Sequence, residues 1–414
     1  MNLSFSFLKI YDILVKNRGQ SDRMLKDFLL DSSEKNNIKK QIYKYIHLHR
    51  RISKIALLQA FNLPQTTLTR IIYDLQDKGF IYNDGTGEPS GGRPPTYYAV
   101  VPNAAYVIGI DISRTHVTAL LTNILFEEVE KIQYKLHAID TPETVIPKLI
   151  MDLKNLLTKY RIKDKALLGI GIGSVGPLDR EKGIILNPDS FVANEWNNVP
   201  IVEMLNKEFS LPITLNNGAN TAAYAEYYLN SLLNDSILYC INGYGVRTGF
   251  LESGVPGNNQ AGDSSAAGHI IIDINGKDCI CGKKGCLAAY TTYKSLLEEI
   301  VAKKDISLLT IEDNAFDFIM KLLKNNDSEV QELVLQSAYY YGVGISNMIN
   351  ILHPNKVFLH GKLIYQYSAY YEKVVKTIKE NINITTNITI QKSKLGEKSV
   401  ALGGAIEIYN AYFK

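Results

Sequence analysis

The sequence has few cysteines and lacks any apolar run long enough to cross a bilayer. Four cysteines among 414 residues exclude a disulfide-stapled scaffold and are typical of a protein of the reducing cytoplasm. The opening residues, MNLSFSFL, also lack the basic start and the long apolar core of a secretory signal. We therefore expect a cytoplasmic protein with no membrane partner, and the length predicts two or three domains.

An excess of charge of one sign is also absent, because the net charge is only +3. The charges are unevenly distributed. Residues 37–102 contain nine Lys/Arg and four Asp/Glu, whereas residues 1–36 contain six and five, so that residues 103–414 are net negative. A small basic segment near the N-terminus is typical of a module that contacts phosphates.

Residues 37–102 have the pattern of a winged helix-turn-helix. Apolar residues recur at helical spacing over 37–50, a second helix begins after the capping residue Ser53, and a third helix extends from Gln65 to Lys78. Short strands are predicted on either side of a polar loop, at 80–82 and 96–100. This order of elements predicts a DNA-binding domain.

Residues 1–36 precede this module as a helical extension. Apolar residues such as Phe5, Leu8, Tyr11 and, further along, Phe28 predict amphipathic helices. Such an extension either adds a dimer contact or brace, or simply covers the core of the winged helix.

The third helix of the module is expected to read DNA, because the second helix of a helix-turn-helix motif lies in the major groove. Its outward positions are Gln65, Thr66, Thr67, Thr69 and Arg70. Gln and Arg can make bidentate contacts to bases, and Thr can bond phosphate or touch a thymine methyl group. In the polar loop, Arg93 follows two glycines and is expected to enter a minor groove. The alternative is a protein-interaction domain with a solvated polar face.

A metal-binding pattern lies much further along the chain, where His269 is followed by Cys279, Cys281 and Cys286. One imidazole and three thiolates make a closed tetrahedral set, as expected of structural Zn²⁺, because catalytic zinc keeps a position open for water. The alternatives are a local disulfide and inert core thiols. The fourth cysteine, Cys240, lies in an apolar run and is expected to pack in the core.

Residues 103–414 alternate apolar strand-like runs with helical stretches, which predicts an α/β fold of two related lobes with a cleft between them. The wing sequence SGGRP, the loop Gly171–Asp179 and the zinc motif at 269–286 resemble the ROK family of repressors and sugar kinases, over residues 37 to about 410. The resemblance implies a two-lobed actin- and hexokinase-like (ribonuclease H-like) ROK domain. It also implies a homodimer or homotetramer on a palindromic double-stranded DNA operator, which is released when a sugar occupies the cleft.

The sequence departs from the family kinases in three loops. Arg114 and Arg247 replace glycines of the two phosphate loops, where glycine lets backbone amides approach phosphate. Gly218 stands where the kinases have the aspartate that removes a proton from the sugar hydroxyl. We therefore expect no catalytic residues and no kinase activity, so that the protein is not expected to be an enzyme.

The family also holds sugars with carboxylates at three positions, which here are Gly218, Ala266 and Ala288. The candidate effector-binding residues that remain are Ser174, Asn217, Arg247 and His269. The effector is then either a different ligand, such as a sugar phosphate that the arginines attract, or absent, with the cleft kept as an oligomerisation scaffold.

These features together predict a sequence-specific transcriptional regulator, a repressor of carbohydrate-metabolism genes. One alternative is an effector-independent oligomeric DNA-binding protein. The other is a sugar kinase with an appended DNA-binding module.

Overall fold

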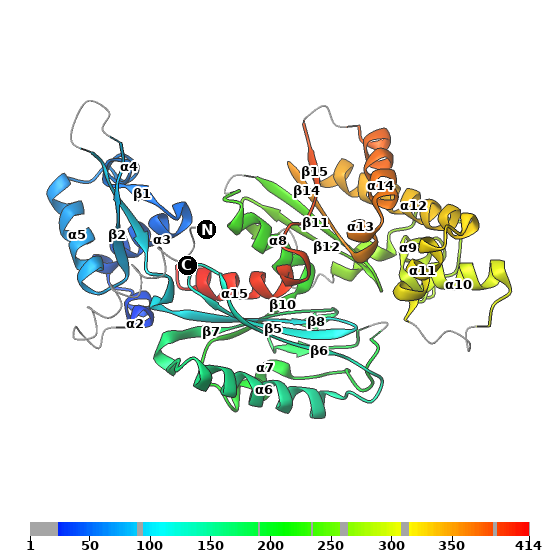
Figure 1. Ribbon diagram of the computed structural model, residues 1–414, viewed down its shortest axis with the longest axis horizontal. Helices are drawn as coiled ribbons and strands as arrows, with labels where there is room; N and C mark the ends of the chain where they lie inside the picture. Colours follow the sequence, from blue (N-terminus) through cyan, green and yellow to red (C-terminus); the bar gives the residue numbers. More distant parts are fainter. Residues whose placement is uncertain are drawn as a thin grey trace.

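The computed structural model describes residues 24–88, 94–188, 191–232, 235–256, 264–307, 314–383 and 387–413. Figure 1 shows a small N-terminal module beside two lobes, each of which is built on a five-stranded sheet. The predicted mixed α/β class and the two-lobed architecture are therefore confirmed.

The N-terminal module packs helices against a three-stranded antiparallel sheet of order β1-β3-β2. Its elements are α2 (Leu25–Leu30), α3 (Glu34–His49), β1 (Ile52–Ser53), α4 (Lys54–Phe61), α5 (Gln65–Asp77), β2 (Ile81–Thr86) and β3 (Thr96–Val100). Ser53 caps α4, because its hydroxyl accepts a hydrogen bond from the Ala56 amide at 3.1 Å. The order helix, helix-turn-helix and two wing strands is the order that the sequence predicts.

Helix α3 begins at Glu34 and not at residue 37, where the sequence pattern placed its start. The acidic side chain in the first turn complements the positive end of the helix dipole, so that the helix extends further back than its apolar stripe. Just before it, Leu25, Phe28 and Leu29 of α2 are buried in the core of the winged helix, as expected of a covering helix. The helix expected around Phe5 lies outside the described residues.

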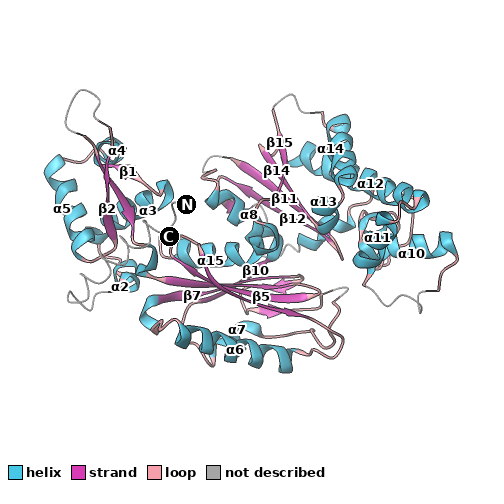
Figure 2. Ribbon diagram, in the orientation of Figure 1, coloured by secondary structure: helices cyan, strands magenta, loops and turns pink. Residues whose placement is uncertain are grey.

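The first lobe contains a mixed sheet of order β10-β7-β4-β5-β6. Its strands are β4 (Tyr106–Ile112), β5 (His116–Asn123), β6 (Glu128–Lys135), β7 (Leu167–Ser174) and β10 (Ile213–Asn217). Figure 2 shows α6 (Pro142–Lys159) and α7 (Ile201–Asn206) below this sheet and α15 (Ser399–Ala411) above it. The short strands β8 (Leu178–Asp179) and β9 (Ile184–Ile185) pair in a hairpin that follows β7.

The second lobe contains a sheet of order β13-β12-β11-β14-β15. Its strands are β11 (Ser236–Asn242), β12 (Val246–Glu252), β13 (Val255–Pro256), β14 (Lys356–His360) and β15 (Thr389–Lys392). One face is covered by helices whose bounds are α9 (Ala288–Thr291), α10 (Tyr293–Lys304), α11 (Ala315–Lys324), α12 (Ser328–Leu352), α13 (Lys362–Gln366) and α14 (Ser368–Asn381). Alternate residues of β11 face opposite sides: Leu238 and Cys240 pack under these helices, and Tyr239 packs under α8 (Gly218–Leu229).

Helices α8 and α15 form the layer between the two sheets (Figure 1). Their backbones pack closely on each other and on the first sheet, because glycine stands at the crossings. A Cβ on Gly403 would lie 1.7 Å from the Thr221 carbonyl oxygen, and one on Gly171 would lie 1.9 Å from that of Gly404. A side chain at either position would therefore push the layers apart.

Candidate functional site

The outer face of α5 presents the residues predicted to read DNA. Leu68, Ile71, Ile72 and Leu75 point into the core, which leaves Gln65, Thr66, Thr69 and Arg70 exposed and Thr67 half-buried. The hydroxyl of Thr69 donates to the Gln65 carbonyl at 2.6 Å and accepts from Lys54 Nζ at 2.8 Å. Arg93 lies outside the described residues.

Two further residues lie on this face, although the sequence analysis did not name them. Tyr73, which follows Arg70 by one helical turn, is 70% exposed, and Lys54 adds a positive charge from the start of α4. The signal for Tyr73 was its i+3 spacing from Arg70, which places both on one side of the helix. Lys54 gave no such signal, because only the crossing of α4 and α5 brings it to Thr69.

The four predicted metal ligands lie together at the edge of the second lobe. The ligand atoms of His269, Cys279, Cys281 and Cys286 all lie within 4.8 Å of one another. Two of these separations are 3.5 Å, from His269 Nδ1 to Cys279 Sγ, and 3.6 Å, from Cys281 Sγ to Cys286 Sγ. A tetrahedral zinc with bonds of about 2.0–2.3 Å sets its ligand atoms about 3.5–3.8 Å apart, so the cluster fits this ion.

The alternatives for these cysteines are not supported by the structure. All four cysteines are free, so no local disulfide forms. Cys281 is exposed, unlike an inert core thiol, whereas Cys240 is fully buried, and burial raises its thiol pKa.

The loop that carries these cysteines requires glycine at position 285. Gly285 has φ of +68°, and a Cβ there would lie 1.5 Å from the Asp273 carbonyl oxygen. The backbone is thus shaped to bring the ligands to one point.

The two unusual arginines lie in the cleft between the lobes, and each packs on a glycine. The Nη1 atom of Arg247 lies 3.3 Å from where a Cβ of Gly218 would stand. The Nη1 atom of Arg114 lies 2.8 Å from the corresponding position on Gly245. Both arginines are nearly buried, at 8% and 7% exposed. Their side chains thus fill the space beside Gly218 and Gly245.

The four candidate effector residues do not surround one cavity. Ser174 is fully buried. Asn217 is the N-cap of α8, where its side-chain oxygen accepts a hydrogen bond from the Ala219 amide at 3.0 Å. His269 lines a cavity of about 340 Å³ that also contacts Arg114 and the zinc loop. Arg247 lines a neighbouring cavity of about 180 Å³ between the lobes.

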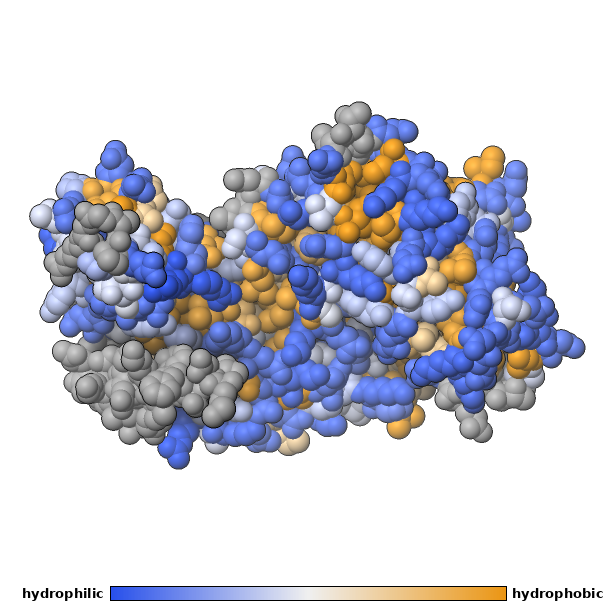
Figure 3. All heavy atoms as spheres, turned by 45° about the horizontal axis from the view of Figure 1, so that its top comes forward, coloured by the Kyte–Doolittle hydropathy of each residue, from blue (hydrophilic) through white to orange (hydrophobic). Residues whose placement is uncertain are grey.

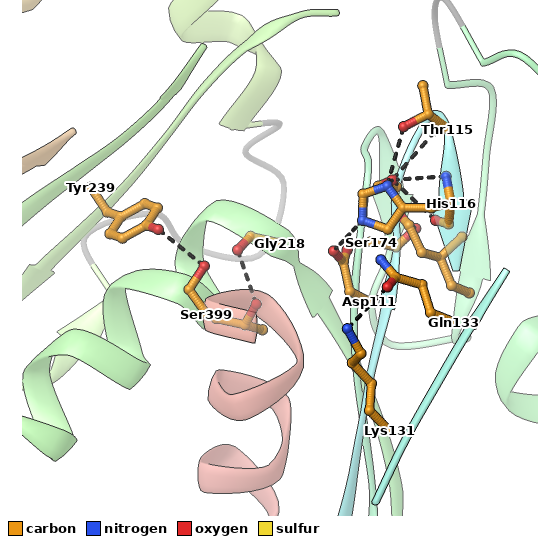
Figure 4. Close-up of polar contacts among 12 residues, drawn as sticks. Asp111, Thr115, His116, Lys131, Gln133, Ser174, Gly218, Tyr239 and Ser399 are labelled. Carbon is orange, nitrogen blue, oxygen red and sulfur yellow. Dashed lines mark hydrogen bonds and ion pairs between the residues drawn. The ribbon is translucent and has the colours of Figure 1, made fainter. Parts of the chain in front are cut away.

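The smaller cavity contains buried polar residues that the sequence reading did not single out. Asp111 Oδ2 lies 3.5 Å from His116 Nε2, and His116 Nδ1 lies 2.8 Å from the Ser113 hydroxyl (Figure 4). Across the cavity, burial and then the nearby Arg247 lower the pKa of His360 to about 4, so this imidazole is neutral at pH 7. The sequence did not single out Asp111 as a cavity residue, because the apolar pattern of β4 does not indicate what packs opposite this strand.

Helix α3 joins the N-terminal module of elements α2 to β3, which is predicted to read DNA and is called the DNA-reading module below, to the rest of the molecule through His47. Its Nε2 lies 2.6 Å from the Ile124 carbonyl oxygen and donates to it, so that Nδ1 accepts from the Tyr228 hydroxyl at 2.9 Å. The ring stacks on Tyr409 with centroids 4.4 Å apart. Burial lowers the pKa of His47 to about 3. In the space-filling view, hydrophobic residues are visible in the hollow between this module and the lobes (Figure 3).

Solved structures share this architecture. A ROK family transcriptional regulator, described as a homologue of the E. coli MLC protein, has a TM-score of 0.72 and 23% identity, covering 91% of this chain and 97% of its own. The ROK hexokinase of Thermus thermophilus has a TM-score of 0.62 and 23% identity, covering 74% and 98%. These likenesses define the fold of the two lobes as hexokinase-like, and the likeness to the first structure extends over nearly the whole chain.

The sequence comparisons identify the family. The ROK family model matches residues 107–410, and the chain belongs to this family. The xylose repressor of Bacillus subtilis (strain 168) is 26% identical over 367 residues, which cover 88% of this chain and 92% of that protein. Among the described residues, no helix combines the length and apolar character that a membrane crossing requires.

Proposed function

We propose that the protein is a sequence-specific DNA-binding transcriptional regulator, a repressor of carbohydrate-metabolism genes, whose ROK domain senses an effector. The observation that carries this proposal is the exposed face of α5, where Gln65, Thr66 and Arg70 stand on a helix-turn-helix scaffold with Lys54 beside them. The similarity to the xylose repressor over 88% of this chain supports the same function.

The proposal includes the loss of sugar kinase activity. Gly218 has no side chain that can accept a proton, and the guanidinium of Arg247 packs against it. Arg114 packs on Gly245 in the second phosphate loop, where bulk excludes a phosphate group. The likeness to the Thermus thermophilus hexokinase fold motivates the competing candidate, a kinase with an appended DNA module. An ADP-release assay with D-xylose, D-glucose and N-acetylglucosamine separates them, because turnover would favour the kinase.

The four-ligand cluster is assigned to structural Zn²⁺, which would fix the loop of residues 269–286 beside the larger cavity. We further propose a homodimer or homotetramer on a palindromic operator, because a twofold protein places two recognition helices on two half-sites. The cytoplasm is the proposed location, since free thiols stay reduced there.

The test is binding of the full chain to its own upstream DNA, measured by fluorescence anisotropy at several stated salt concentrations. Arg70→Ala is expected to weaken specific binding by about tenfold to a hundredfold, as one bidentate base contact is worth about 1–3 kcal/mol. Lys35→Ala removes an equal charge from an exposed site at the start of α3 and serves as the control. Equal losses in both variants, or in neither, would contradict reading by α5.

The role of the effector is tested in the same assay by adding sugars and sugar phosphates. Release by one compound supports a ligand-controlled repressor. Operator affinity that no compound alters supports the effector-independent alternative, in which the ROK domain serves assembly.

A further inference from the structure

The hydroxyl group of Thr69 on α5 is already engaged within the protein. Its Oγ1 donates a hydrogen bond to the Gln65 carbonyl oxygen at 2.6 Å and accepts one from Lys54 Nζ at 2.8 Å. A threonine hydroxyl carries a single proton, and the bond to Gln65 uses it. Although Thr69 is exposed on the face predicted to read DNA, its hydroxyl therefore has no donor left for a phosphate oxygen or a base acceptor.

The bond from Lys54 connects the two helices of the helix-turn-helix at their outer surface. Lys54 is the first residue of α4, whereas Thr69 lies in α5, 15 residues further along the chain. Figure 1 shows α5 on the side of the module that faces away from the two lobes. The ammonium group of Lys54 has three donor hydrogens, and among the described residues Thr69 accepts the only hydrogen bond that it makes. Two donors therefore remain for a group outside the protein.

The charge of Lys54 is not neutralised by a carboxylate. Elsewhere in the module, Lys39 and Lys78 both pair with Asp74. Within the described part of the chain, Lys54 has the neutral hydroxyl of Thr69 as its partner and no ion pair. Its positive charge is therefore available to an anion.

The position of Lys54 in its helix is unfavourable for stability. The first turn of a helix carries the positive end of the helix dipole, where acidic side chains stabilise the helix and cations destabilise it. Helix α4 has no acidic residue in its first turn, and Lys54 adds a positive charge there. A lysine at this place is thus better explained by an anion outside the protein than by the folding of α4.

We propose that Thr69 is a positioning residue, which holds the ammonium group of Lys54 against one phosphate of the DNA backbone and does not itself read a base. The proposal rests on the proposed function, since it requires that α5 meets DNA. A lysine that is already held loses less conformational freedom when the phosphate binds. Phosphate contacts also fix the register of a protein on the duplex, so a held Lys54 would set where Arg70 meets the bases.

A phosphate contact and a base contact have different signatures. For each phosphate that a protein neutralises, the logarithm of the binding constant falls against the logarithm of the salt concentration with a slope of about 0.9. This contribution does not depend on the DNA sequence. A base contact instead adds affinity for the operator and little for unrelated DNA.

The test is the salt dependence of binding of the full chain to its own upstream DNA and to an unrelated duplex of equal length, measured by fluorescence anisotropy. Lys54→Gln is expected to reduce the slope by about 0.9 for each module bound, on both duplexes. Thr69→Val, which keeps the shape but lacks the hydroxyl, is expected to weaken binding to both duplexes by about twofold to tenfold, because Lys54 is no longer held. Thr69→Ser keeps the hydroxyl and is expected to retain wild-type binding.

The double variant Lys54→Gln/Thr69→Val shows whether the two residues act together. If Thr69 acts only through Lys54, removing its hydroxyl from the Lys54→Gln protein has no further effect on either duplex. Additive losses, or a loss in Thr69→Val that is confined to the operator, would show that Thr69 contacts DNA itself and would overturn the proposal. An unchanged slope in Lys54→Gln would overturn the phosphate contact.

The matched control is Lys35→Gln, which removes an equal charge from the exposed start of α3 and should leave the slope unchanged. A slope that both variants reduce equally would report net charge alone and would overturn the assignment to Lys54. A wild-type protein that binds neither duplex would refute the proposed function as well, whereas tight operator binding with an unchanged slope in Lys54→Gln would refute only the role of Lys54. Circular dichroism confirms that each variant is folded before its binding is interpreted.

Discussion

The two ends of helix α15 adjoin buried polar residues whose hydrogen bonding differs: His47 of α3 stacks on Tyr409, and Asp111 of β4 lines the same cavity as Ser399. At the end near the DNA-reading module, both ring nitrogens of His47 are hydrogen-bonded. At the end near the cleft, one oxygen of the buried Asp111 has no partner. The hydroxyl of Tyr409 near His47 also has no hydrogen-bond partner among the described residues, but burying a neutral hydroxyl costs less free energy than burying a carboxylate oxygen.

This difference separates a fixed contact, here called the joint at His47, from a cavity lining whose hydrogen bonds are incomplete. A buried group whose hydrogen bonds are complete holds two parts in one arrangement, because moving either part leaves polar atoms unpaired. A buried acceptor that lacks a donor favours any ligand that brings one. The same helical layer therefore adjoins a fully hydrogen-bonded residue of the N-terminal module at one end and an unsatisfied acceptor at the cleft.

The largest expected effect comes from the His/Cys cluster, two of whose residues line the larger cavity. Cys281→Ser removes one of four ligands and is expected to lose stoichiometric zinc, measured by inductively coupled plasma mass spectrometry. Structural zinc contributes about 10 kcal/mol or more to folding of small zinc domains, so the loop and the larger cavity should lose order. We also expect a weaker oligomer and weaker operator binding, whereas Cys240→Ser should keep the zinc. Full operator affinity in a zinc-free variant would contradict the structural role.

The second-largest effect is expected from removing His47, which connects the N-terminal module to the lobes. His47→Ala leaves the Ile124 carbonyl and the Tyr228 hydroxyl without their partner and opens a cavity against Tyr409. The free energy of unfolding is expected to fall by about 3–5 kcal/mol, measured by urea denaturation. His49→Ala, on the exposed side of the same helix, should change it by less than about 1 kcal/mol. Equal effects of the two variants would refute the joint.

The pH dependence of stability sharpens the assignment of His47. Because burial lowers its native pKa from 6.5 to about 3, the unfolded chain binds a proton between these values that the folded chain does not. The contribution of neutral His47 to the free energy of unfolding is complete above about pH 6.5. It is lost as the pH falls below this value, at up to about 1.4 kcal/mol per pH unit. His47→Gln should flatten the slope of unfolding free energy against pH in this window. An unchanged slope would show that His47 is accessible to protons in the folded protein.

The smallest effect is expected at the other end of the layer. Asp111→Asn replaces a buried, partly unpaired carboxylate by a neutral group of the same shape, so the ligand-free protein should keep its unfolding free energy within about 1 kcal/mol. Thermal unfolding and urea denaturation measure this difference. A loss of several kcal/mol would show that Asp111 is fully paired in the folded state, and it would remove the contrast with His47.

The sequence predicted the elements that depend on residues close together in the chain, such as helix caps and apolar spacing. Ser53 caps α4 because its hydroxyl reaches an amide three residues ahead, and the apolar residues of α5 recur at helical spacing. The His/Cys cluster was predictable because three of its four residues fall within eight residues, so that a tight loop brings them together. Each of these features depends on chain neighbours, whose distances the backbone limits.

The tertiary structure alone decided which distant residues meet. Nothing in the sequence near Gly218 indicates that Arg247 packs against it, or that Lys54 reaches Thr69. His47 lies 181 residues from Tyr228, and Asp111 and Asn242, which belong to different lobes, line the same cavity. Such contacts depend on how the sheets and helices pack, since packing and not spacing sets distances between separate elements. The sequence by itself determined the local elements, the family resemblance and which four residues form the His/Cys cluster, whereas the fold decided the contact of His47 and the cavity between the lobes.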